Sequence, residues 1–311
     1  MRRALAATLG ATLTLVGLAW AGTPAEGTFP AENGRIAFAA ENPGFQIYTI
    51  RADGTGLRRV THVPGGGASQ PDWSGDGTRI AFGRERTDGT SDVIVMDADG
   101  SNRHNLTKSG YETQPAFSPD DQHLYFECDC HPQGIFVMRD DGTARRRITT
   151  HGFRGEADSD PNTSPDGGTV TFVRHKVDGE LQALMAVDRT GDNLRRLVPY
   201  RREVAIKHDW APDGEHIVIT INADYPHGRS PNVATIRSDG TGLRQLTHYA
   251  GGRQGAFAGS YSPDGRWIVF RVENLKTNVF RLVKMHPDGT HRTRIATLPF
   301  APRGIDWGPR P

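Results

Sequence analysis

One short stretch returns five times along the chain and constrains the fold more than any other feature. Each copy starts with an aromatic residue or a threonine, passes through a Ser-Pro-Asp-Gly-like turn and ends in an apolar run. The copies, which begin at Trp73, Phe117, Thr163, Trp210 and Tyr261, read WSGDGTRIAF, FSPDDQHLYF, TSPDGGTVTF, WAPDGEHIVI and YSPDGRWIVF. Their first residues are 44, 46, 47 and 51 positions apart. A strand-rich period of about 40–50 residues predicts propeller blades or another repeat array.

The residue types of the repeated stretch predict a β-hairpin. Proline suits the first turn position because its φ is fixed near −65°, and glycine suits the position where φ becomes positive. A second marker follows in most units, an apolar run and then Asp-Gly-Thr or Asp-Gly-Ser, within residues 95–107, 137–149, 235–247 and 284–296. Asp-Gly between apolar runs is a strong hairpin signal. Each unit is therefore predicted to hold four strands, here called A to D.

Counting the second strands predicts six blades, with strand B at residues 35–38, 79–82, 123–126, 169–173, 216–219 and 267–270. The first unit has third and fourth strands at residues 46–50 and 57–61 but no strand A before residue 35. The missing strand is expected from Ile305 to Trp307, which would pair with Arg35 to Phe38 and close the ring, because closure removes exposed sheet edges. Unit four is the most degenerate, with Thr163 in the aromatic position and Arg189-Thr190-Gly191 in place of Asp-Gly-Thr. The predicted fold is an all-β, six-bladed β-propeller of four-stranded blades.

The N-terminal residues have the pattern of a secretory signal. A basic start at Arg2 and Arg3 precedes an apolar run and a small-x-small cleavage pattern at Ala19-Trp20-Ala21. We expect residues 1–21 to be a signal peptide, residues 22–32 a leader and residues 33–311 the propeller, and hence a secreted or extracytoplasmic protein. A retained membrane anchor is the alternative. The formal net charge of +1 falls to −1 without the two arginines, and this near-neutral balance argues against nucleic acid as the main partner.

At these repeats the chain resembles the TolB-type, WD40-like propeller repeat, whose signature is W-S-P-D-G followed by an I-A-F strand and a Y-V-M-D-x-D-G strand. The resemblance covers about residues 33–308. It implies the propeller fold, and it implies little about activity because one fold hosts many functions. Secreted propellers of this type resemble binding scaffolds, and relatives with similar repeats include sugar lyases and the propeller parts of peptidases.

Candidate site residues gather on one predicted face. In a blade, strand A lines the central channel, and the D–A and B–C loops share one face of the ring, where binding residues tend to sit. The proposed ligand-binding set on that face is Gln70, Gln114, Asp160, Arg174, His175, His208, Tyr225, His227 and Arg303. Further polar residues beside the strand-A aromatics are Asp72, Asn162, Asp209 and Asp306. The alternative is ordinary loop and channel polarity filled with water.

Cys128-Asp129-Cys130-His131 follows strand B of blade three on the same face. Two thiolates and an imidazole could bind zinc or copper, but three local ligands without a second cluster make a weak metal candidate. The two cysteines could instead form a disulfide bond with each other or remain as free thiols. We therefore predict no metal and no cofactor.

No Gly-x-Ser-x-Gly elbow, His-Glu-x-x-His motif or phosphate loop occurs in the sequence. The expected function is non-catalytic binding of a protein or cell-envelope ligand through the D–A/B–C face, by a monomer that contacts membrane only through an uncleaved signal peptide. A carbohydrate-active lyase or hydrolase acting at the channel mouth is the second hypothesis, and a metal-binding propeller is the third. Whether the protein is an enzyme is left open, with a scaffold favoured over catalysis.

Overall fold

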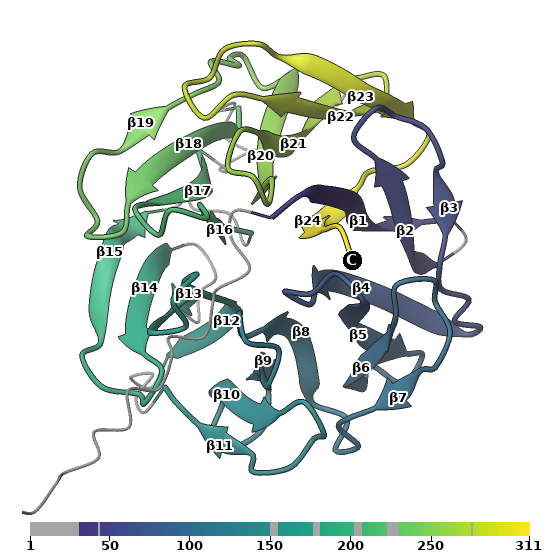
Figure 1. The fold of residues 1–311 in the computed structure, drawn as a ribbon. Helices are drawn as coiled ribbons and strands as arrows, with labels where there is room; N and C mark the ends of the chain where they lie inside the picture. Colours follow the sequence, from purple (N-terminus) through teal and green to yellow (C-terminus); the bar gives the residue numbers. More distant parts are fainter. Residues whose placement is uncertain are drawn as a thin grey trace, which may run out of the picture.

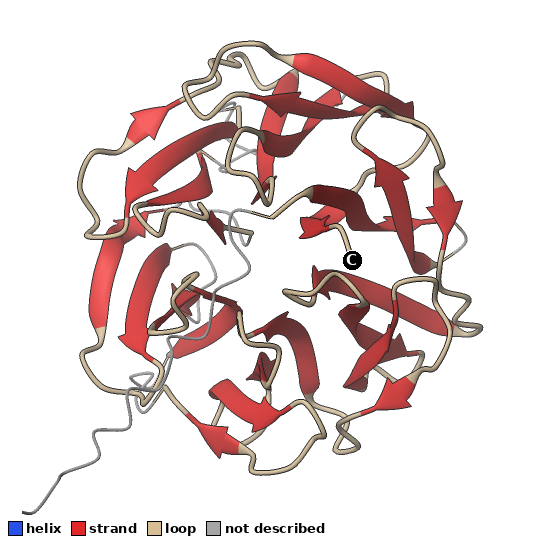
Figure 2. Ribbon diagram, viewed as in Figure 1, coloured by secondary structure: helices blue, strands red, loops and turns tan. Residues whose placement is uncertain are grey.

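The computed structural model describes residues 31–42, 44–149, 155–176, 181–201, 207–222, 230–274 and 276–311. These residues form six four-stranded antiparallel sheets arranged as a ring around a central channel (Figure 1). All regular structure in the described ranges is strand (Figure 2). The prediction of a six-bladed, all-β propeller is confirmed. Within the same ranges no helix is long and apolar enough to cross a bilayer.

The blades follow one another around the ring in chain order. In the order A to D, blade one holds β24 (Arg303–Pro309), β1 (Asn33–Glu41), β2 (Phe45–Arg51) and β3 (Arg58–Arg59). Blade two holds β4 (Gly66–Trp73), β5 (Arg79–Arg86), β6 (Ser91–Asp97) and β7 (His104–Asn105). Blade three holds β8 (Glu112–Phe117), β9 (His123–Cys128), β10 (Gly134–Arg139) and β11 (Arg146–Arg147).

The second half of the ring repeats this order. Blade four holds β12 (Glu156–Thr163), β13 (Thr169–Lys176), β14 (Gln182–Asp188) and β15 (Arg195–Arg201). Blade five holds β16 (Asp209–Trp210), β17 (His216–Ile221), β18 (Asn232–Arg237) and β19 (Arg244–Gln245). Blade six holds β20 (Gln254–Tyr261), β21 (Ile268–Asn274), β22 (Val279–Met285) and β23 (Thr293–Leu298).

The ring is closed by the last strand of the chain. β24 pairs antiparallel with β1, with Trp307 opposite Ile36 and Asp306 opposite Ala37. Figure 1 shows the C-terminus beside β1, the first strand of the described chain. The predicted closure is therefore confirmed, and blade one is assembled from both ends of the described sequence.

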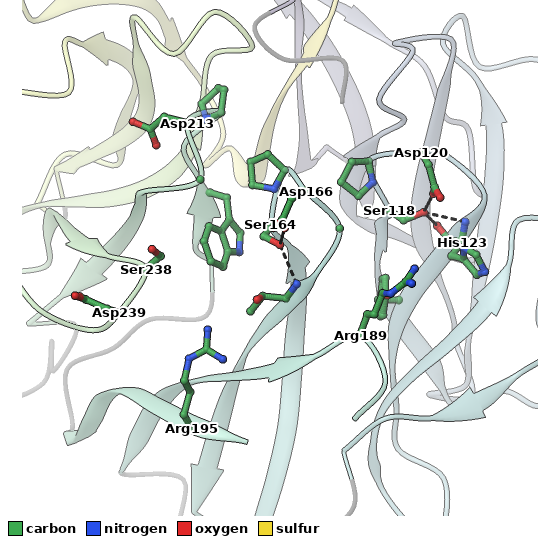
Figure 3. A pocket seen from close by; sticks show the side chains of 18 residues that line it. Ser118, Asp120, His123, Ser164, Asp166, Arg189, Arg195, Asp213, Ser238 and Asp239 are labelled. Carbon is green, nitrogen blue, oxygen red and sulfur yellow. Dashed lines mark hydrogen bonds between the residues drawn. The ribbon is translucent and has the colours of Figure 1, made fainter. Parts of the chain in front are cut away.

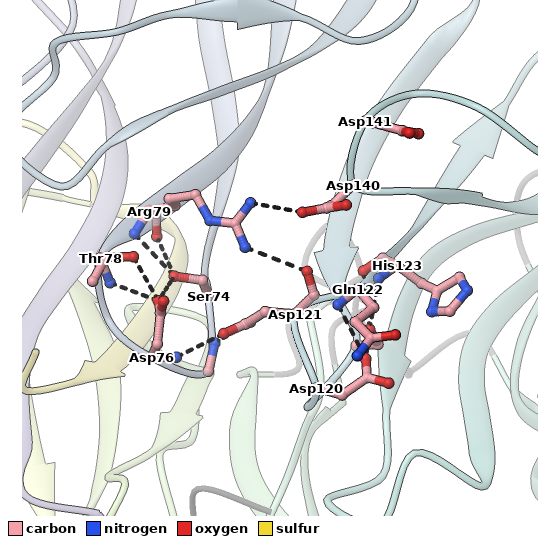
Figure 4. Close-up of polar contacts among 12 residues, drawn as sticks. Ser74, Asp76, Thr78, Arg79, Asp120, Asp121, Gln122, His123, Asp140 and Asp141 are labelled. Carbon is pink, nitrogen blue, oxygen red and sulfur yellow. Dashed lines mark hydrogen bonds and ion pairs between the residues drawn. The ribbon is translucent and has the colours of Figure 1, made fainter. Parts of the chain in front are cut away.

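The A–B turns form the hairpins that their sequences predict. In blade two, Gly77 N–H donates to the carbonyl of Ser74, and the Asp76 carboxylate accepts from the Ser74 hydroxyl and from Thr78 N–H. Blade two has Gly75 where most copies have proline, which leaves an extra backbone donor. Blade three compensates with Asp121 in place of glycine, whose carboxylate accepts from Gly75 N–H and, at 2.9 Å, from Asp76 N–H (Figure 4).

The core consists of six apolar clusters, one at each interface between neighbouring blades. In strand B, the side chain of the fourth residue packs toward the preceding blade and that of the third toward the following blade. The fourth residue is a fully buried phenylalanine in five blades. The third residue faces the strand-A aromatic of the following blade, as Ala37 faces Trp73 and Ala81 faces Phe117. A large aromatic therefore packs against a small residue across most interfaces.

The interface between blades three and four reverses this pairing. Strand A of blade four supplies Thr163, and strand B of blade three supplies Tyr125 where other blades have alanine, threonine or valine. Tyr125 is 5% exposed and packs with Val170 and Phe172 of blade four. The Thr163 hydroxyl donates to the carbonyl of Phe117 at 3.0 Å. The interface thus keeps an aromatic ring, but the ring comes from the opposite blade.

A β-bulge recurs in the innermost strands. The pairing of strand A with strand B shifts register between Ser69 and Asp72 in blade two, and blades three, four and six have shifts at the equivalent place. The bulge puts Gln70, Gln114 and Asp160 in the left-handed region, with φ near +50°. Non-glycine residues visit this region at a cost in energy, so the surrounding structure must hold them there. Three of the predicted site residues thus occupy one recurrent backbone position.

Candidate functional site

In four blades, the residue before the strand-A aromatic accepts a hydrogen bond from the next blade and so ties neighbouring blades together around the channel. Asp72 accepts from the backbone N–H of Phe117 at 2.7 Å, and Asp306 accepts from that of Trp73 at 2.8 Å. Asp209 accepts in the same way from the backbone N–H of Tyr261, and the Ser260 hydroxyl accepts from that of Trp307. This belt encloses a central cavity of about 100 Å³ that residues from all six blades line.

The belt carries an unusual concentration of buried charge. Burial raises the pKa of Asp209 to about 7 despite the opposing attraction of Lys207, and burial also raises the pKa of Asp72 and Asp306 above their usual range. Burial opposes the charge on Lys207, but attraction from the surrounding carboxylates outweighs it and raises the pKa of the ammonium group. Lys207 therefore acts as an internal counter-ion for this ring of aspartates, because a buried charge persists only when it is paired.

Asp160 and His208 meet above this belt at the channel mouth. His208 is 1% exposed, and its Nδ1 lies 3.2 Å from a carboxylate oxygen of Asp160. Its Nε2 lies 2.8 Å from the Thr171 hydroxyl, which also accepts from the Trp210 indole N–H. Gln114 accepts a hydrogen bond from the backbone N–H of Asp160. The structure thus brings three predicted site residues together in one network that spans blades three, four and five.

Arg174 and His175 lie on the same strand, β13, and have different surroundings. Arg174 is 5% exposed and binds Asp158 through two bonds of 2.6 and 2.8 Å. Such a buried bidentate pair fixes both side chains. Nε2 of His175 is bonded to the Ser159 hydroxyl, and burial lowers the pKa of His175. The imidazole is therefore neutral at pH 7 and can accept a proton.

Glu127 is the residue that sequence reasoning missed at this mouth. Burial first, and then repulsion from Asp129, Asp160 and Asp158, raise the pKa of Glu127 to about 8. Its carboxyl group is therefore protonated at neutral pH and can donate a hydrogen bond or a proton. The pKa of the Glu127 carboxyl is raised and the pKa of the His175 imidazole is lowered, and strongly perturbed pKa values of this kind are typical of functional sites. The only signal in sequence is an acidic residue in an otherwise apolar strand.

The remaining predicted residues are less connected. Arg303 is exposed and lies over the ring of Phe45, with 5.9 Å from guanidinium carbon to ring centroid. Gln70 approaches Gly304 of blade one closely enough that a Cβ there would be 2.5 Å from its amide oxygen. Tyr225 and His227 lie outside the described residues.

Cys128 and Cys130 form a disulfide bond, with 5.1 Å between their Cα atoms. The sequence left a disulfide, free thiols and a metal site open, and the bond commits both sulfur atoms to each other. His131, the third residue of the weak metal candidate, is exposed. The Arg145 guanidinium lies over the rings of Phe126 and Phe136 and pairs with buried Glu112, which ties this end of blade three together.

Comparison with known proteins agrees with this architecture. Residues 60–251 match the family model described as TolB beta propeller domain. A TolB homologue from Chlorobium luteolum is 32% identical over 142 residues, which are 44% of this chain and 31% of that protein, so the match spans under a third of its length. TolB from Acinetobacter baumannii superposes with a TM-score of 0.72 at 21% identity, over 89% of this chain and 67% of that chain. A putative TolB from Agrobacterium tumefaciens superposes with a TM-score of 0.65 at 18% identity, over 87% of this chain and 91% of that chain.

Proposed function

Because the chain belongs to the TolB beta-propeller family, we propose that it is a secreted scaffold that binds a protein of the cell envelope. The contact is made by the face that carries the D–A and B–C loops. The proposed contact residues are Gln70, Gln114, Asp160, His175, Tyr225, His227 and Arg303. Arg174 and His208 act as positioning residues, because Arg174 binds Asp158 and His208 lies against Asp160 at the same channel mouth.

The observation that carries this proposal is the ionisable cluster at the mouth between blades three and four. Glu127 and His175 are perturbed groups whose side chains the repeat does not need for its turns or its core. The exposed residues beside them, Asp129 and His131, lie in the B–C connection of blade three. By contrast, the turn carboxylates of the other face accept hydrogen bonds from their own turns, as Asp53 does from Thr55.

A pull-down from envelope extracts with residues 22–311 tests the face assignment. Arg303→Ala and His131→Ala change exposed side chains at the mouth, and losing an interface residue of this kind can cost about 2 kcal/mol, or about 30-fold in affinity. Asp99→Asn on the opposite face is the matched control, because its carboxylate is fully exposed in a C–D turn. We expect capture to fall for the mouth variants only, and equal loss in all three would refute the face assignment.

The second candidate is a carbohydrate-active enzyme at the same mouth. It is favoured by one observation, the protonated Glu127 and the neutral His175, which could act as a proton donor and acceptor. Incubation of the purified domain with envelope polysaccharides would decide between the two functions. Turnover that Glu127→Gln and Asp160→Asn both abolish would replace the scaffold by the enzyme.

Secretion has its own test. Residues 1–30 lie outside the described residues, so the proposal of a cleaved signal stands on sequence alone. We expect the protein in the extracytoplasmic fraction with an N-terminus at Gly22. A chain that begins at Met1 and stays with the membrane fraction would establish the retained anchor.

A further inference from the structure

The disulfide bond between Cys128 and Cys130 does little to hold the fold together. It joins two residues of one segment, with a sequence separation of two, and encloses only Asp129. Cys128 is already fixed as the last residue of β9, where it pairs with Glu112 of β8 and Gly134 of β10. The chain-entropy gain from a disulfide grows with the length of the loop that it closes. The stability of the fold therefore gives little reason for a bond at this place.

The two sulfur atoms differ in their access to solvent. Cys128 is fully buried, in the apolar cluster between blades two and three. Cys130 is only partly buried, in the B–C connection that follows β9. A thiolate attacks a disulfide at a sulfur atom that it can reach, and the other sulfur leaves as a thiolate. An incoming thiolate would therefore attack Cys130, and Cys128 would leave.

A cation lies beside the sulfur atom that would leave. Nη2 of Arg145 is 2.9 Å from Sγ of Cys128 and 3.7 Å from Sγ of Cys130. The guanidinium lies over two phenylalanine rings of the same blade and pairs through Nη1 with Glu112, which is fully buried. Glu112 offsets part of the positive charge, but the pair uses Nη1, so Nη2 can donate to a thiolate at Cys128. An adjacent arginine stabilises a thiolate and so favours its departure.

Tyr111 adds an exposed aromatic side chain next to the cysteine pair. It is 53% exposed, and its carbonyl accepts a hydrogen bond at 2.9 Å from the N–H of Asp129, the residue between the two cysteines. A tyrosine ring at the surface offers a large contact area with an apolar body and a polar tip. A thiol carried by a polypeptide can gain a contact here that a small thiol does not make.

We propose that this site is a thiol–disulfide exchange centre that oxidises pairs of cysteine thiols in polypeptides. A substrate thiolate attacks Sγ of Cys130, the bond to Cys128 breaks, and Cys128 leaves as a thiolate beside Arg145. The second substrate thiolate then attacks the substrate sulfur of this mixed disulfide, which releases the substrate as a disulfide and Cys130 as a thiolate. Two electrons pass from the substrate to the protein, and the two protons lost by the substrate thiols are taken up by the two cysteines. A low-molecular-weight disulfide such as oxidised glutathione restores the protein by the reverse exchange.

This activity goes beyond the binding of an envelope protein and does not depend on it. The sequence contains only two cysteines, so every thiol found in the protein belongs to this pair. The probe is a reduced peptide with two cysteines, mixed with an equal amount of the oxidised protein, quenched with acid, alkylated and followed by mass spectrometry. We expect the peptide to gain a disulfide as the protein gains two alkylated cysteines. The rate should be about tenfold or more above that of a synthetic oxidised peptide of residues 126–132, which lacks the arginine.

Two outcomes of this measurement would refute the site. A protein disulfide that reacts no faster than the one in the synthetic peptide would show that its surroundings do not promote exchange. Reduction that unfolds the protein, followed by circular dichroism, would show that the bond is structural.

Single-cysteine variants assign the roles of the two sulfur atoms. Cys128→Ser keeps the accessible Cys130 and should form a mixed disulfide with a peptide disulfide. Cys130→Ser keeps only the buried Cys128 and should react at least about tenfold more slowly. Equal rates, or a faster reaction at Cys128, would overturn the order of attack.

Two further variants test the cation and the aromatic ring. Arg145→Gln/Glu112→Gln removes both partners, so that no buried charge is left alone, and should slow exchange about tenfold with both the peptide and dithiothreitol. Tyr111→Ala should slow the peptide several-fold and leave the rate with dithiothreitol unchanged. A rate with the peptide that Tyr111→Ala does not change would overturn polypeptide thiols as the substrate class.

Arg195→Gln/Asp188→Asn is the matched control, because it also removes an arginine–acid pair, with 3.9 Å between the two groups. Arg195 lines a groove of about 870 Å³ on the opposite face, formed by the A–B turns of blades three to five and the C–D turns of blades four and five (Figure 3). We expect this variant to exchange at the parent rate, with melting temperatures of all variants close to that of the parent protein. Slowing equal to that of the Arg145 variant would overturn the role of Arg145.

Discussion

The interface between blades three and four differs from the interface that joins blade six to blade one. At the latter, Trp307 of strand A and Val269 of strand B pack in one hydrophobic cluster. At the former, Thr163 and Tyr125 exchange the large and small positions, Glu127 lies at the channel mouth, and Tyr125 lines the groove of the opposite face. The volume of an interface can therefore be kept while its chemistry changes. An aromatic ring from strand B fills the volume that an aromatic ring from strand A fills at the other interfaces.

The largest effect is expected at the regular interface between blades six and one. Deleting residues 303–311 removes β24, exposes the edge of β1 and uncovers the cluster beneath Trp307. Loss of such an aromatic alone costs about 3–5 kcal/mol, comparable to much of a domain's net stability. We expect the truncated protein to aggregate or to melt far below the parent in calorimetry. Melting within a few degrees of the parent would show that closure contributes little.

The exchanged pair gives the next largest effect. Tyr125→Ala should destabilise the fold by about 3–5 kcal/mol in urea unfolding, because it empties the aromatic volume of that interface. Adding Thr163→Tyr to Tyr125→Ala restores the arrangement of the other interfaces and should recover more than half of the loss. If the double variant is no more stable than Tyr125→Ala alone, the two positions do not share one volume, and the comparison of interfaces fails.

The sequence predicts the regular part of the molecule well, because its signals are local. Pro-Asp-Gly and Asp-Gly-Thr turns determine hairpins within a few residues, and the hairpin count gives six blades and the closing strand. The exchange at Tyr125 was within reach too, since aligned B strands show Tyr125 beside Ala37, Ala81 and Val218. The aspartates of the channel were also visible beside the strand-A aromatics, but their pairing with Lys207 was not, because Lys207 and Asp306 come together only when the ring is built.

At the interface between blades three and four, Glu127 should make the stability of the fold depend on pH. The folded-state pKa of Glu127 is about 8 and its ordinary value is 4.5, so between these values the folded protein holds a proton that the unfolded chain has released. This stabilisation is fully present below pH 4.5 and is lost as pH rises through 8, with a slope of at most about 1.4 kcal/mol per pH unit. Urea unfolding from about pH 5 to about pH 9 should show that Glu127→Gln reduces this slope. An identical slope in parent and variant would place the titration elsewhere.

The smallest effect concerns the compensating turns of blades two and three. Asp121→Gly leaves Gly75 N–H and Asp76 N–H without their carboxylate, but it also relieves the positive φ of +59° at residue 121. A net loss of about 1 kcal/mol is expected. Gly75→Pro together with Asp121→Gly recreates the standard motif and should unfold within about 0.5 kcal/mol of the parent. A double variant that is less stable than Asp121→Gly would show that the two sites are not a compensating pair.

Closure by β24 also has a consequence for the order in which the protein can be made. Blades two to six are each contiguous in the chain, but blade one needs β1 and β24, which lie at opposite ends of the described sequence. During synthesis or export from the N-terminus, one edge of β1 stays unpaired while the other blades emerge. Long-range pairing of this kind slows folding and leaves strand edges exposed to other chains. Blade one can therefore be completed only after β24 has been synthesised, and the edge of β1 stays unpaired until then.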